Sequence, residues 1–186
     1  MERLVISGKR EATATEKSVA LAFSQIQESS ESFKTALKGV EIKSVKEVKD
    51  AGNQVLVITV PYKQIAGLKP VIPTLLAELE KKLSSTPIIV GAHRAFPKTP
   101  EHGRRYKAIR PYGRTLRAVN DAILEDVCYP TTIVGKHVHY DLQGKQTTKV
   151  TLDANDVSRV EHKLGAFSAA FNRLTGIHTV FEVARQ

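Results

Sequence analysis

The middle of the chain contains a segment that cannot form part of a folded core. Residues 91–117 read GAHRAFPKTPEHGRRYKAIRPYGRTLR, with eight Lys or Arg against one acid, Glu101, so their net charge is 8 − 1 = +7. Since the whole chain carries +9, the remaining residues contribute only 9 − 7 = +2. These like charges repel one another unless anions lie among them, and Pro and Gly recur throughout. We therefore expect an extended basic loop, with the core built from the sequence on either side of it.

The basic segment predicts contact with nucleic acid. A phosphate backbone binds clustered cations because condensed counterions are released. Arginine outnumbers lysine six to two here, which suits forked contacts with phosphate oxygens. Phe96, Tyr106 and Tyr112 lie among the cations, where they could stack on unpaired bases or equally anchor the loop to its own domain. A charged run is usually a solvated surface, but rarely with so little acid.

The overall composition is that of an ordinary globular protein. The 186 residues fit one domain, with 41% hydrophobic and 25% charged residues. Cys128 is the only cysteine, which favours a reducing compartment. The first residues contain neither a long apolar run nor a basic leader, and no segment reaches the roughly 18 apolar residues of a membrane span. We expect a soluble, intracellular protein with an acidic partner.

Before the basic segment, local patterns predict helices around a β-hairpin. Residues 13–16 (TATE) form a capping box, which marks the start of a helix. Residues 40–48 and 54–60 read as the two strands of a hairpin. Pro73 can lie in the first turn of a further helix, where its missing N–H costs nothing. Residues 87–90 (PIIV) form the last predicted strand of this half.

After the basic segment a similar order is predicted. Thr115 caps a helix with apolar positions Leu116, Val119, Ile123 and Val127, which ends at Pro130. Residues 132–142 and 145–152 form a second hairpin. Asp153 then caps one long helix that ends at Gly176, and residues 178–183 form a last strand. The apolar positions of that helix alternate at steps of three and four: Val157, Val160, Leu164, Phe167, Phe171 and Leu174.

These elements predict a single α/β domain over residues 1–186. We expect one mixed β-sheet with two hairpins and helices packed against it, plus an extended basic loop at residues 91–117 that binds nucleic acid. The two halves of the chain repeat a loosely similar order of two strands, a helix and a strand.

Two groups of polar residues could hold a metal ion, but the commoner explanation is favoured for both. His137 and His139 lie two apart on a predicted strand and share a face, yet two histidines do not build a closed site. Asp121, Glu125 and Asp126 lie on one predicted helix, and the first two could hold magnesium in a nuclease. Such residues are more often a hydrated helix face or ion-pair partners. No motif of a catalytic nucleophile or phosphate-cradling loop is present, so no enzyme, metal or cofactor is predicted.

Residues 110–126 (RPYGRTLRAVNDAILED), followed by Tyr129-Pro130 and residues 133–136 (IVGK), strongly resemble a known family. It is the eukaryote-specific ribosomal protein seven of the small subunit. Weaker likenesses occur at residues 44–48 (SVKEV), 78–82 (ELEKK), 160–163 (VEHK) and 174–176 (LTG), in order along the chain. The family's loop is usually longer and richer in lysine, with serine where Gly113 stands and arginine where His137 stands. These departures predict a divergent lineage, distant from animals and fungi.

The resemblance implies a structural constituent of the small (40S) ribosomal subunit. Such a protein binds small-subunit ribosomal RNA and neighbouring small-subunit proteins, and supports subunit assembly and translation. It implies a cytoplasmic, ribosomal location with a nucleolar phase, and no catalysis, membrane or small-molecule substrate. The resemblance assigns RNA contacts to Arg94, Lys98, Arg110, Arg114 and Lys136. The charge argument adds Arg104, Arg105, Lys107 and Arg117.

Two other functions stay open at the level of sequence. A free-standing RNA-processing enzyme would use the acidic helix and the histidines, and would show a metal-dependent activity that is lost when Asp121 or Glu125 is altered. A protein-interaction module would instead grip an acidic protein with the basic loop, and competition with RNA would separate it from an RNA-binding protein.

Overall fold

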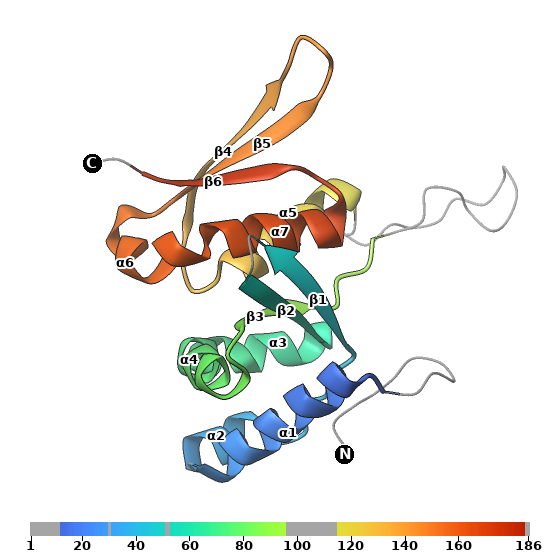
Figure 1. The fold of residues 1–186 in the computed structure, drawn as a ribbon, viewed down its shortest axis with the longest axis vertical. Coiled ribbons are helices and arrows are strands. Elements are labelled where there is room, and N and C mark those ends of the chain that lie inside the picture. Colours follow the sequence, from blue (N-terminus) through green and yellow to red (C-terminus); the bar gives the residue numbers. More distant parts are fainter. Residues whose placement is uncertain (1–11, 30, 51–52, 96–114, 185–186) are drawn as a thin grey trace, which may run out of the picture.

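The computed structural model of the chain describes residues 12–29, 31–50, 53–95 and 115–184 (Figure 1). The first half contains α1 (Ala14–Ser29), α2 (Glu31–Ala36), β1 (Ser44–Asp50), β2 (Asn53–Val60), α3 (Tyr62–Leu68), η1 (Lys69–Val71), α4 (Ile72–Leu83) and β3 (Thr86–Gly91). The second half contains α5 (Leu116–Cys128), β4 (Ile133–Tyr140), β5 (Gln146–Leu152), η2 (Ala154–Asp156), α6 (Val157–Val160), η3 (Glu161–Lys163), α7 (Leu164–Thr175) and β6 (Thr179–Val183). The predicted mixed α/β class is confirmed. In the part that the structure describes, no helix is both long and apolar enough to cross a membrane.

The predicted capping box starts α1 and also fixes that helix to the first sheet. Thr13 Oγ1 accepts the N–H of Glu16 at 3.3 Å, and the Glu16 carboxylate accepts the N–H of Thr13 at 3.0 Å. Glu16 is almost completely buried, and its second carboxylate oxygen accepts the N–H of Val45 at 3.4 Å. The same carboxylate therefore accepts one backbone N–H at the start of α1 and another in β1. N–H groups at a buried helix end need such acceptors because water does not reach them.

The strands form two three-stranded sheets, not the single sheet that the sequence led us to expect. The first has the order β1-β2-β3 and the second the order β4-β5-β6. In each sheet the hairpin strands are antiparallel, and the third strand runs parallel to the second strand of the hairpin. Both predicted hairpins are confirmed. The expectation of one sheet was wrong because each half of the chain closes its own sheet through a helical crossover, which the strand patterns alone do not reveal.

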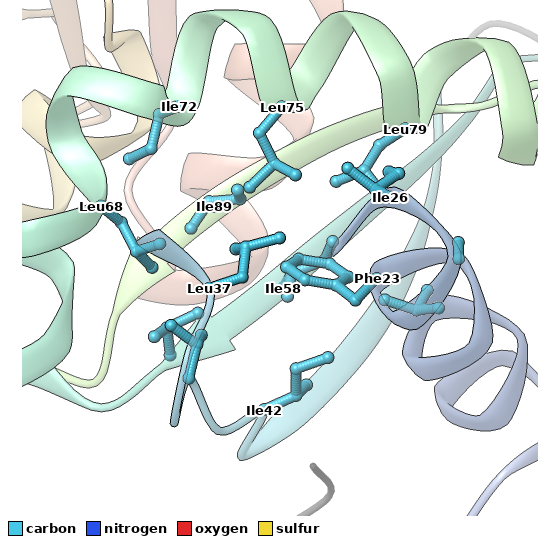
Figure 2. Packing of buried hydrophobic residues seen from close by; sticks show 14 of the residues in the cluster. Phe23, Ile26, Leu37, Ile42, Ile58, Leu68, Ile72, Leu75, Leu79 and Ile89 are labelled. Atoms are coloured by element: carbon cyan, nitrogen blue, oxygen red, sulfur yellow. The ribbon is translucent and has the colours of Figure 1, made fainter. Parts of the chain in front are cut away.

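Helices cover the first sheet on both faces because its strands are apolar on both faces. Leu56, Ile58 and Ile89 pack with α1 and α4, as Figure 2 shows for part of this core. Val55 and Val57 point the other way and pack with α5 and α7. The second sheet lies on the far side of α7, which it contacts through Val150, Leu152 and Phe181. The layers are therefore α1 with α4, sheet one, α5 with α7, and sheet two (Figure 1).

Two predicted helices differ in detail from the structure. Thr115 caps α5 by accepting the N–H of Ala118 at 3.4 Å, as expected, but Leu116 is exposed and Leu124 is buried instead. Leu116 lies in the first turn, ahead of the part of α5 that packs on the core. The long helix of residues 157–174 is interrupted by the 3-10 turn η3. Apolar steps of three and four fit an α-helix and a single 3-10 turn equally well, so the pattern did not reveal the break.

The second core depends on the aromatic side chains of α7. Phe167 and Phe171 are 5% and 1% exposed, and the Phe167 ring meets Phe181 of β6 edge to face with centroids 6.0 Å apart. Gly176 ends the helix with φ +74°, a conformation that favours glycine. The apolar stripe predicted for this helix is thus confirmed at both phenylalanines.

We expect Phe171→Ala to lower the free energy of unfolding by about 3–5 kcal/mol, because it leaves a cavity between the two sheets. Leu142→Ala is the matched control, since Leu142 is fully exposed at the tip of the β4–β5 hairpin. Urea unfolding followed by circular dichroism measures both variants. A Phe171→Ala protein as stable as Leu142→Ala would show that α7 does not carry this core.

Candidate nucleic-acid interface

Three of the nine predicted RNA contacts lie in the part of the chain that the structure describes. Arg94 follows β3, Arg117 lies in the first turn of α5, and Lys136 lies on β4. All three are exposed. The other six lie outside the described residues: Lys98, Arg104, Arg105, Lys107, Arg110 and Arg114. The three aromatic residues of the segment, Phe96, Tyr106 and Tyr112, lie outside them as well.

Both described ends of the basic segment lie at α5. The chain leaves β3 at Gly91, whose N–H binds Asp126 in the last turn of α5. Residues 92–94 then lie against the same helix, since Ala92 and Arg94 line one groove together with Val119 and Ala122. Since α5 itself begins at the other end of the segment, Arg117 lies on this helix, and Arg94 lies in a groove beside it.

Lys136 is brought to this helix by an ion pair. Its ammonium group contacts the carboxylate of Asp121, which lies one turn after Arg117 on α5. Both side chains are partly exposed, at 35% and 42%, so solvent screens the pair and its contribution to stability is about 0–1 kcal/mol. The pair places a cation of the second sheet at the helix that carries Arg117.

The three acids of α5 do not act together. Asp121 pairs with Lys136, Glu125 is exposed, and Asp126 is buried with His93. Within the described ranges, no group of three or more His, Cys, Asp or Glu side chains could hold a metal ion. We expected ion pairs between these acids and nearby arginines; Asp121 does form an ion pair, but with a lysine. The arrangement gives no support to a nuclease centre on this helix.

Asp126 and His93 form a buried pair that the sequence did not predict. His93 Nε2 donates to Asp126 Oδ2 at 2.8 Å, and the same oxygen accepts the N–H of Gly91 at 2.9 Å. The side chains are only 9% and 8% exposed. A Cβ at residue 91 would lie 3.1 Å from both Asp126 Oδ2 and His93 Nε2, so glycine allows the close approach of β3 to α5.

A groove of about 630 Å³ lies beside this pair, between α3 and α5. Its lining includes the cations Lys63, Lys69 and Arg94 and the carboxylates Glu125 and Asp126. Tyr62, the first residue of α3, is 61% exposed at this groove, and its ring contacts that of His93 edge to face with centroids 5.3 Å apart. The groove thus joins an exposed aromatic ring to two lysines and to Arg94 at the start of the basic segment.

The other reactive side chains named from the sequence lie apart from this groove. His137 and His139 are exposed on β4, where they pair with Lys149 and Thr147 of β5. Cys128 is fully buried, and burial raises the pKa of its thiol from 9.0 to about 12. A thiol in that state stays protonated at neutral pH, so Cys128 packs the core and is no nucleophile.

Sequence reasoning missed Tyr62, Lys63, Lys69 and His93. They belong to no motif, and the His93–Asp126 contact joins positions 33 residues apart. The one local signal is the step from the apolar strand 87–90 through Gly91 to a histidine and an arginine. Only the packing of α3 and α5 against β3 brings His93 to the other three residues.

We expect Asp126→Ala to lower the free energy of unfolding by about 1–3 kcal/mol, because it leaves the Gly91 N–H and the His93 ring without their buried partner. Asp121→Ala, which removes an exposed acid from the same helix, should cost about 0–1 kcal/mol. Guanidinium unfolding measures both. Equal costs would contradict the assignment of Asp126 as the residue that fixes β3 to α5.

The fold and its surface define a basic α/β protein that presents cations around one helix end. Comparison with known proteins identifies its family: residues 3–183 match the family described as ribosomal protein S7e. The chain belongs to the S7e family of ribosomal proteins.

Similar proteins occur in fungi, plants and animals. Small ribosomal subunit protein eS7A of Saccharomyces cerevisiae is 41% identical over 172 residues, which cover 92% of this chain and 90% of that protein. The eS7 protein of Avicennia marina is 37% identical, with the same coverage. The eS7 protein of Caenorhabditis elegans is 34% identical over 183 residues, which cover 97% of this chain and 94% of that protein. The resemblance proposed from residues 110–126 is thus confirmed, and the distance from animals and fungi stays a prediction.

Proposed function

We propose that this chain is a structural constituent of the small ribosomal subunit that binds ribosomal RNA and supports subunit assembly and translation. The observation that carries this proposal is membership of the S7e family over residues 3–183. Its yeast relative, 41% identical, is named a small ribosomal subunit protein. The basic surface supports the same function, because arginines form forked, charge-assisted hydrogen bonds with phosphate and clustered cations release the counterions of a phosphate backbone.

Residues 91–117 are the proposed RNA-binding loop within one ribosomal-protein domain of residues 1–186. The described cations Arg94, Arg117 and Lys136 would extend the loop's surface onto the folded part of the protein. Their positions around α5 let the loop and the helix contact one stretch of RNA. The remaining proposed contacts are Lys98, Arg104, Arg105, Lys107, Arg110 and Arg114.

The proposed partners are small-subunit ribosomal RNA and neighbouring ribosomal proteins. A structural role of this kind requires no catalysis, and the separate environments of Asp121, Glu125 and Asp126 favour it over an RNA-processing enzyme. The corresponding location is the cytoplasmic ribosome, with a nucleolar phase while the subunit is assembled.

Binding should be electrostatic and should depend on the loop. We expect Arg104→Gln, Arg105→Gln, Lys107→Gln and Arg110→Gln together to weaken binding to small-subunit ribosomal RNA. The slope of log affinity against log salt should flatten by roughly 0.7 per lost contact on single-stranded RNA. Filter binding over a range of salt concentrations measures both quantities.

The matched control removes the same charge elsewhere. Four exposed lysines of the first half serve for this: Lys17 on α1, Lys34 on α2, Lys38 just after α2, and Lys46 on β1. Changing all four to Gln should leave the affinity and the salt slope at the parent values. In cells that express both proteins, the loop variant should enter small subunits poorly against the parent. Loss of affinity in both variants alike, or absence of the parent protein from small subunits, would contradict the proposal.

A further inference from the structure

We infer that the groove between α3 and α5 binds an unpaired nucleotide of the RNA, with its base stacked on Tyr62 and its phosphates held by Lys63, Lys69 and Arg94. This inference rests on the proposed RNA-binding function. It adds a contact surface on the folded part of the protein, where residues of α3 that lie outside the basic loop join Arg94 at its start.

Tyr62 is the proposed stacking surface. Its side chain is 61% exposed although it begins a helix that otherwise packs inward through Ile65 and Leu68. Its ring is not left to rotate freely, since the His93 ring meets it edge to face at 63°. An exposed aromatic face held in one orientation suits base stacking, because little conformational entropy is lost when a base settles on it.

His93 holds this orientation because it is itself fixed. Asp126 accepts its Nε2–H at 2.8 Å, and Asp126 is fixed in turn by the Gly91 N–H at 2.9 Å. With Nε2 as donor, the second ring nitrogen, Nδ1, has no hydrogen-bond partner among the described residues. The His93 side chain is about nine-tenths buried and lines the groove. It therefore offers one polar atom to a bound group while it positions Tyr62.

The charge of the groove favours an anionic ligand. Three cations, Lys63, Lys69 and Arg94, face two carboxylates in its lining. Asp126 is buried and already accepts two hydrogen bonds, which leaves Glu125 as the exposed acid. The Lys69 backbone is fixed by its carbonyl, which accepts the Tyr129 hydroxyl at 2.8 Å, and its ammonium group lies 6.0 Å from the centroid of the Tyr129 ring.

Size and position point to a nucleotide. The volume of about 630 Å³ lies within the range of about 300–1,000 Å³ typical of small-molecule sites. Arg94 belongs both to the groove and to the start of the basic segment. A strand of RNA whose phosphate is bound by Arg94 therefore lies beside the groove, and an unpaired base there can turn onto Tyr62. Paired bases cannot, because they are already stacked in the duplex.

The test compares oligouridine with an RNA duplex of the same length, by fluorescence anisotropy with the full chain. We expect Tyr62→Ala to lower the affinity for oligouridine about fivefold or more, and to change duplex binding by less than about twofold. Tyr62→Phe keeps the ring and should bind as the parent does. Tyr140→Ala is the control, since Tyr140 is 65% exposed on β4, in the outermost layer.

A second arm tests the cations and the contact itself. Lys63→Gln with Lys69→Gln should flatten the salt slope by roughly 0.7 per lost phosphate contact, while Lys34→Gln with Lys38→Gln should leave it unchanged. Oligouridine that carries 5-iodouracil should crosslink under light to Tyr62, as located by mass spectrometry.

The outcomes separate this inference from the proposed function. The groove does not bind an unpaired base if Tyr62→Ala and Tyr140→Ala have the same affinity for oligouridine. The same conclusion follows if Tyr62→Ala loses as much affinity for the duplex as for oligouridine. In that case the loop variant still loses affinity if the proposed function is correct. If the parent protein binds neither RNA, the proposed function itself fails.

Discussion

The burial of α5 and α7 between two sheets determines most of this structure. Phe167 and Phe171 of α7 and Leu124 and Val127 of α5 pack with Val55 and Val57 of sheet one, and with Val150 and Leu152 of sheet two. Neither sheet could bury its inner face without these helices, and both helices would expose apolar surface without the sheets. The single helical layer therefore holds the two halves of the chain in one domain. It also fixes where α5 begins, and hence where the basic segment meets the folded protein (Figure 1).

The buried Asp126–His93 pair transmits that arrangement to the surface. A carboxylate at 8% exposure requires hydrogen-bond donors, and it obtains them from the Gly91 N–H and the His93 ring. These bonds hold the end of β3 against α5 and hold the His93 ring in its edge-to-face contact with Tyr62. The geometry of the exposed groove thus depends on an interaction that is itself hidden from solvent. This coupling explains how a surface of long, flexible cations can include one rigid aromatic face.

Local patterns predicted the helices and strands well because each has a chemical signal in sequence. The capping box at residues 13–16 forms both reciprocal hydrogen bonds, and Thr115 caps α5. The apolar stripe of α7 and its end at Gly176 were also readable. The number of sheets could not be predicted from the sequence. The pattern of a strand specifies which of its residues face a core, but not which other strand lies next to it. The break at η3 was hidden for a related reason, since one 3-10 turn preserves the spacing of the stripe.

By itself, the sequence determined the chemistry: the apolar faces of most helices and strands, a concentrated basic segment, and the family to which the chain belongs. Those features depend on composition and on short-range spacing, which need no knowledge of packing. Only the tertiary structure decided how the charges are used. In the folded protein Lys136 forms an ion pair with Asp121, and Asp126 is buried away from the other acids of its helix. Tyr62 contacts His93, which lies 31 positions further along the chain. Contacts between residues so far apart in sequence arise from the packing of whole elements, so no local pattern encodes them.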